Sequence, residues 1–195
     1  MTANNSLAKR QEQSIEYDSN GTNIKLNPKI VRDFLVSGSG NVSDQEVVMF
    51  LNLCKAQRLN PFLREAYLIK YGNSAATIVT GKEVFTKRAR RNKAYSGHEA
   101  GVVIRTDKGL EYRSGTLVLS DEELVGGWAK VHIKGDVVPL EVTVSFAEYC
   151  LMKDGKPASN WAVKPATMIR KVALVQALRE AFPEELNGMY DGSEC

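Results

Sequence analysis

The sequence predicts an α+β protein in which antiparallel β-hairpins pack with helices. Three observations support this prediction: apolar residues recur at helical spacing near both ends, period-2 alternation between short turns fills the middle, and a helical segment interrupts the hairpins. This order is typical of helices gathered on an antiparallel sheet. At 195 residues the chain is long enough for one core domain with its own apolar interior.

Three regions are expected along the chain. Residues 1–26 are polar, rich in Asn, Ser and Gln, and contain a Ser-Asn-Gly-Thr tract at 19–22. This composition predicts a flexible N-terminal arm that orders only on a partner. Residues 27–190 form the predicted α+β domain, and residues 191–195 form a short tail.

Capping residues mark the first helices. A short helix begins at Pro28 and ends at the Ser-Gly repeat 37–40. Ser43 and Glu46 have the spacing of a capping box, and the helix they open must stop before Pro61, because a helical residue directly before proline is disfavoured. The apolar positions of that second helix are Val47, Val48, Phe50, Leu51 and Cys54.

The period then changes to that of strands. A basic segment at 80–95 and a final segment at 165–182 return to helical spacing, with Pro165 in the first turn and Pro183 after the last. The predicted hairpins comprise residues 65–71 with 75–80, 101–105 with 111–119, and 127–133 with 140–145.

Composition limits the classes of function. The net charge of +3 excludes a protein whose whole surface is strongly positive, so local clusters of charge matter more than the total charge. Cys54, Cys150 and Cys195 are scattered and odd in number, which supports neither a disulfide framework nor a metal site. No signal peptide and no stretch of roughly 20 apolar residues is present. We therefore expect a cytoplasmic protein without a membrane partner.

The chain is poor in residues that carry out catalysis. His98 and His132 lie outside any zinc-binding motif, and the Thr-Gly-Lys at 80–82 is a fragment of a phosphate-binding loop. The acidic runs at 121–123 and 184–185 suit solubility and helix-end electrostatics better than paired metal ligands. We expect no catalytic residue, no metal and no cofactor, and hence a protein that is not an enzyme.

Two basic segments indicate a polyanionic partner. Residues 80–95 hold six basic residues and one acid, and residues 164–179 add a second basic stretch near the other end of the chain. The two stretches could meet across one groove, or each could be a solvated helix face. The chain has no helix-turn-helix, zinc finger or basic zipper, so we expect contacts to a nucleic-acid backbone with little sequence preference.

Individual residues in and near these segments allow two interpretations. Arg88 lies either in a groove or in a structural ion pair, and the same choice applies to Arg170 and Lys171 beside the apolar face of the last helix. Trp161 offers either a flat surface for a base or an anchor for the core. Arg113, with Lys108, is a candidate from the middle hairpin.

Several segments carry a resemblance to a known family: residues 60–67, 76–85 with 89–91, 161–173 and 178–182. In these segments the chain resembles the RecT/Bet family of phage single-strand annealing proteins. The resemblance covers roughly residues 28–190 and implies ATP-independent annealing of complementary DNA strands by a homo-oligomer, a ring or a helical filament. The implied partners are single-stranded DNA, the annealed duplex, a phage exonuclease and a host single-strand-binding protein.

The resemblance and the basic segments together give the predicted DNA contacts. The predicted nucleic-acid-binding residues are Lys82, Lys87, Arg88, Arg91, Lys108, Arg113, Trp161, Lys164, Arg170 and Lys171.

The C-terminal end departs from the family pattern. Family members commonly carry a further C-terminal region for partner proteins, whereas this sequence ends at Cys195. Either the sequence is part of a longer chain or that partner function is absent.

Two other functions remain open from the sequence. A DNA-binding regulator or architectural protein of a phage that does not anneal strands would prefer duplex DNA and would form no filaments. A nuclease that uses the acidic runs would cleave strands in a metal-dependent reaction.

Overall fold

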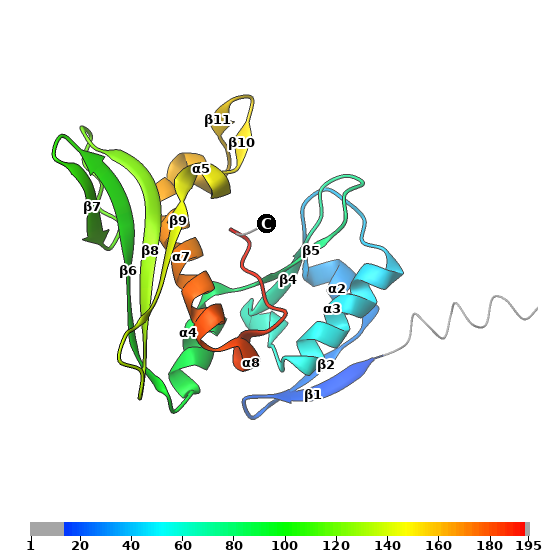
Figure 1. Ribbon diagram of the computed structural model, residues 1–195. Coiled ribbons are helices and arrows are strands. Elements are labelled where there is room, and N and C mark those ends of the chain that lie inside the picture. The colour runs from blue at the N-terminus through cyan, green and yellow to red at the C-terminus, as the bar shows by residue number, and fades with distance from the viewer. Residues whose placement is uncertain (1–13, 194–195) are drawn as a thin grey trace, which may run out of the picture. The chain divides into compact units, whose positions relative to one another are not determined.

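The computed structural model describes residues 14–193. The chain forms two compact units, Met1–Gly81 (unit 1) and Lys82–Cys195 (unit 2), which we describe separately (Figure 1). Helices and mainly antiparallel sheets confirm the predicted α+β class. The single core domain expected at 27–190 instead divides at Gly81. A strand runs directly into a helix there, without the Gly-, Pro- or Ser-rich linker that marks a boundary in a sequence.

The first element of unit 1 corrects the expectation of a flexible arm. Strands β1 (Ile15–Ser19) and β2 (Thr22–Leu26) form an antiparallel hairpin, and the hydroxyl of Tyr17 donates a 2.6 Å hydrogen bond to the carbonyl of Leu59. The hairpin buries Tyr17, Ile24 and Leu26 on one face. These few apolar residues alternate with polar ones. The polar composition of the segment as a whole therefore concealed the alternation that is typical of a strand. The remainder of the predicted arm, residues 1–13, lies outside the described residues.

The helices of unit 1 begin where their capping residues predict. The side chain of Asn27 accepts a hydrogen bond from the backbone of Ile30 at the start of α2 (Pro28–Phe34). In α3 (Asp44–Ala56), Ser43 and Glu46 form the predicted capping box, each side chain bonded to the backbone of the other. Val47, Phe50, Leu51 and Cys54 of α3 are buried, which confirms the predicted apolar face apart from the exposed Val48.

A three-stranded sheet completes unit 1, with a 3-10 turn, η1 (Pro61–Leu63), before its central strand. Strands β4 (Ala66–Ile69) and β5 (Thr77–Thr80) form the predicted antiparallel hairpin, and β3 (Val36–Ser37) adds to β4 in parallel. Glu46 joins α3 to this hairpin, because its carboxylate also accepts hydrogen bonds from the ammonium of Lys70 at 2.8 Å and from the backbone of Ala76 at 2.7 Å. The Lys70 charge, with the backbone donors, lowers the pKa of Glu46 to about 2.

Unit 2 is built on a four-stranded antiparallel sheet of order β7-β6-β8-β9. Helix α7 (Pro165–Ala181), close to the predicted range, lies along one face of this sheet (Figure 1). The approach is close at Gly127, where an added Cβ atom would lie 2.5 Å from the carbonyl oxygen of Ile169. The strands are β6 (Tyr95–Thr106), β7 (Gly109–Ser114), β8 (Glu123–Ile133) and β9 (Leu140–Ser145).

The remaining elements of unit 2 are short, apart from the basic helix α4 (Lys82–Arg91). None of the helices within residues 14–193 has the length and apolar character needed to cross a membrane. The short elements are α5 (Phe146–Tyr149), β10 (Met152–Lys153), β11 (Lys156–Pro157), α6 (Asn160–Val163) and α8 (Pro183–Leu186).

Acid should weaken unit 1 through Glu46. Because its pKa is lowered in the folded state, the ionised carboxylate stabilises the protein fully above the ordinary value near 4.5, and that contribution is lost as the pH falls towards about 2. We expect Glu46→Gln to lower the melting temperature at pH 7. In a plot of melting temperature against pH, the variant should also show a smaller decrease on the acid side (the acid limb) than the wild type. The exposed Glu148→Gln is the control, and an unchanged acid limb in the Glu46 variant would contradict this role.

Candidate nucleic-acid interface

Helix α4 presents a basic outer face because its apolar residues face the core. Val84, Phe85 and Ala89 are buried at helical spacing, so the residues between them point towards solvent. Lys82 is partly exposed and lies 3.8 Å from the carboxylate of Glu83, a distance that gives only a weak surface pair. The exposed basic residues of α4 are Lys87, Arg90 and Arg91.

Arg88 has a structural role on the same helix. Its Nη1 donates a 3.0 Å hydrogen bond to the carbonyl of Glu185, and the nearby Asn92 side chain bonds the carboxylate of the same residue. Both contacts tie the C-terminal turn of α4 to α8. Of the two interpretations of Arg88, the structure therefore favours a structural contact over a position in a groove.

Arg170 is held in place through one nitrogen of its guanidinium group. This half-buried residue of α7 donates from Nε to the carbonyl of Ala100 in β6 at 3.1 Å. Its two terminal nitrogens have no hydrogen bond or ion pair with any residue in 14–193. A guanidinium fixed through Nε still presents donors in the fork geometry that suits a phosphate.

The two basic segments meet at His98, a half-buried residue near the start of β6. Burial of the imidazole, together with the positive charges of Arg170 from α7 and Arg90 from α4, holds the pKa of His98 below its ordinary value. The Nδ1 atom of His98 lies 2.6 Å from the hydroxyl of Tyr95, which orients the ring. Charges from helices far apart in the sequence thus act on one strand residue. We call His98, Arg90 and Arg170 the His98 cluster.

Lys171 follows Arg170 in the sequence but makes a different kind of contact. Its ammonium forms a 2.7 Å ion pair with Asp191, whose side chain is only 4% exposed. The same carboxylate accepts hydrogen bonds from the backbone and hydroxyl of Ser193. The structure favours a structural ion pair for Lys171, one of the two interpretations that the sequence left open.

Trp161 is a core anchor. It is 4% exposed, and its ring packs edge-on against Phe146 with centroids 5.8 Å apart, so neither face is available to stack on a base. The prediction of a DNA contact at Trp161 is corrected accordingly. Lys164, between α6 and α7, is exposed.

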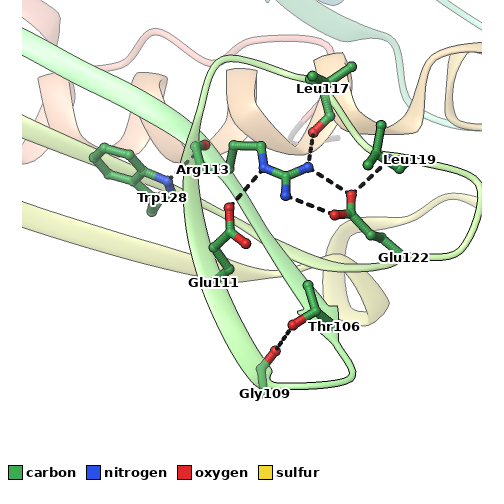
Figure 2. Close-up of polar contacts among 8 residues, drawn as sticks. All are labelled: Thr106, Gly109, Glu111, Arg113, Leu117, Leu119, Glu122 and Trp128. Carbon is green, nitrogen blue, oxygen red and sulfur yellow. Dashed lines mark hydrogen bonds and ion pairs between the residues drawn. The ribbon is translucent and has the colours of Figure 1, made fainter.

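Arg113 is bound within the protein rather than open to a ligand. Figure 2 shows its guanidinium between Glu111 and Glu122, and the two carboxylates raise the pKa of Arg113 above its ordinary value. Glu122 also accepts a hydrogen bond from the backbone of Leu119, and Arg113 donates to the carbonyl of Leu117. The arginine therefore fixes the loop between β7 and β8, and this use of its charge argues against the predicted DNA contact.

The structure brings together part of the predicted set. Helix α4, which carries Lys82, Lys87 and Arg91, packs against α7, which carries Arg170, and both helices pack against β6. Lys108 is exposed in the turn at the opposite end of β6, roughly 25 Å of extended strand away from His98. His98 was not among the residues predicted for the site. Its position in a strand just after the basic helix was the available signal.

No group of histidine, cysteine and acidic residues suitable for a metal ion occurs within the described part of the chain.

Two neighbouring substitutions separate structural from accessible cations. Lys171→Ala should lower the free energy of unfolding by roughly 3 kcal/mol, because it leaves the Asp191 carboxylate buried without its lysine. Arg170→Ala should lower it by only about 1 kcal/mol, since the Ala100 carbonyl keeps its hydrogen bond from Gly115. Denaturant titration of both variants measures the difference, and equal losses would contradict the two assignments.

Comparison with known proteins identifies the family of this chain. An uncharacterised protein of Ureaplasma parvum serovar 3, UU154, is 29% identical over 134 residues, which are 69% of this chain and 52% of the relative. The chain thus spans about half the length of the curated relative that it matches. The RecT family profile matches residues 22–195. Because that match extends over nearly the whole chain, the protein belongs to the RecT family.

Proposed function

We propose that this protein binds single-stranded DNA and anneals complementary strands in phage homologous recombination. The observation that carries the proposal is the convergence of two basic segments on His98, where the terminal nitrogens of Arg170 make no hydrogen bond or ion pair with a residue in 14–193. Membership of the RecT family, which implies single-strand annealing recombination, supports the same function.

Phosphate binding explains why such a surface would be useful. Lysine and arginine side chains that neutralise phosphates release counterions and bind without regard to sequence. A strand held by its backbone keeps its base edges accessible, so that a second strand can be tested by pairing. The energy of the reaction then comes from base pairing, and the protein needs neither a nucleotide nor a metal ion.

The proposed contacts are the cations that remain exposed or partly exposed. Lys87, Arg90 and Arg91 are exposed on α4, and Lys82 is partly exposed. Arg170 provides a positioned fork, whereas Lys164 and Lys108 would meet the strand farther along its path. The proposal leaves out Arg88, Arg113, Lys171 and Trp161, because their contacts within the protein hold the fold together.

Assembly would multiply these contacts. Each subunit supplies a small number of phosphate contacts, and neighbouring subunits on one strand would make binding cumulative. We therefore include a homo-oligomer, as a ring or a helical filament, in the proposed function. We also propose, as partners, a phage exonuclease that exposes the strand and a host single-strand-binding protein.

Annealing measured without nucleotide or metal tests the proposal. Two complementary fluorescent oligonucleotides mixed with the protein in chelator should anneal faster than without it, and the effect should weaken steeply as salt increases. Unrelated sequences should be accelerated to a similar extent. No acceleration in chelator, strand cleavage, or a preference for preformed duplex would contradict the proposed function.

Matched arginine variants show whether the His98 cluster is responsible. Arg170→Ala should reduce binding to one strand by about 1.5 to 3 kcal/mol, the usual worth of a hydrogen bond to a charged group. Arg105→Ala is the control, since Arg105 forms an exposed pair with Glu123 near the opposite end of β6. Equal losses in the two variants would point to nonspecific electrostatics instead of the cluster.

A further inference from the structure

Unit 1 contains a pocket with aromatic walls, separate from the residues assigned to DNA above. The pocket has a volume of about 180 Å³, and its lining includes Phe34 from α2, Phe62 from η1 and Tyr67 from β4. Phe34 is 76% exposed and Phe62 is 53% exposed, so solvent reaches both rings. Neither phenylalanine ring stacks on another aromatic ring within residues 14–193.

Hydrogen bonds on its buried side hold the turn that presents Phe62. The side chain of Asn60 accepts a hydrogen bond from the backbone of Phe62, and the backbone of Asn60 donates to the carboxylate of Glu65, a residue that is 8% exposed. The Asn60 carbonyl accepts hydrogen bonds from both Leu63 and Glu65. A buried carboxylate and several backbone hydrogen bonds thus fix a turn whose outer side chains lie in solvent.

Arg64 ends this turn in a conformation that non-glycine residues rarely adopt. Its φ angle is 57°, in the left-handed region, where a side chain strains the backbone. The backbone at Gly81 lies close to this turn, because a Cβ atom added to Gly81 would be 2.9 Å from the carbonyl oxygen of Arg64. The Arg64 side chain is exposed, lines the pocket, and has no acidic partner within residues 14–193.

We infer that this pocket takes one base of a single DNA strand, with Arg64 on an adjacent phosphate. The size fits, because a cavity of about 150 Å³ accommodates a benzene ring. Aromatic walls suit the face of a nucleobase. The charge also fits, since Arg64 is the one charged residue in the lining and bears no counter-charge in the described chain. An apolar side chain of a second copy would leave this guanidinium without a partner.

The inference deepens the proposed function and rests on it, because it adds a base contact to phosphate binding. Stacking in this pocket would be tolerant of sequence, since every base has a π face. It would give the protein a preference for unpaired strands, because a base within a duplex is not free to enter.

Oligonucleotides with and without bases test the pocket. Oligothymidylate and an abasic strand of equal length carry the same phosphate charge, so the ratio of their affinities isolates the contribution of the bases. The full chain should prefer oligothymidylate, and Phe62→Ala should reduce that preference by roughly 5- to 150-fold, the range expected for base–aromatic stacking. Arg64→Ala should weaken binding of both strands by a similar factor.

Controls separate this inference from the alternatives. Tyr71→Ala removes an exposed aromatic residue of unit 1 outside the pocket lining, and it should leave the preference unchanged. Circular dichroism checks that all variants are folded. If the preference for oligothymidylate survives Phe62→Ala, or if the wild-type protein binds both strands equally, the inference about the pocket is overturned and the proposed function is not. Failure to bind either strand overturns the proposed function as well.

A second copy of the chain is the remaining occupant to test. Light scattering without DNA gives the oligomeric mass of the wild type and of Phe62→Ala. A mass that falls in the variant while the preference for bases persists would assign the pocket to subunit contacts and overturn the inference.

Discussion

The close packing of α7 on the four-stranded sheet is the constraint on which unit 2 depends. The absence of a side chain at Gly127 lets the backbone of Ile169 approach β8, and the buried face of the helix fills the space on either side. This contact fixes Arg170 beside the Ala100 carbonyl and close to His98. The helix that packs the core of unit 2 therefore also positions Arg170, one residue of the basic surface.

Ion pairing within the fold divides the basic residues into two groups. Arg113 and Lys171 are held by carboxylates, so their charge is used to fix a loop and the C-terminal segment. The terminal nitrogens of Arg170 make no hydrogen bond or ion pair with a residue in 14–193, and Arg64 of unit 1 has no acidic partner there. A net charge of +3 conceals this division. The distribution of partners, and not the number of basic residues, indicates where a polyanion would bind.

The sequence predicted the features that depend on local interactions. The capping box at Ser43, the boundary at Pro183 and the apolar face of α3, apart from Val48, follow from short-range rules and were confirmed. The partner of Arg113 could not be predicted, since Glu122 follows a loop whose course is set by the folded sheet. The hairpin at 15–26 was missed because its buried residues are few and its packing is nonlocal.

Titration of His98 by NMR tests the central claim that the His98 cluster holds phosphates. His98 should titrate below its ordinary pKa in the free protein, because it is buried near Arg170 and Arg90. Saturation with single-stranded DNA should raise that pKa, since phosphates offset the two positive charges. An unchanged His98 pKa in the saturated complex would contradict the account.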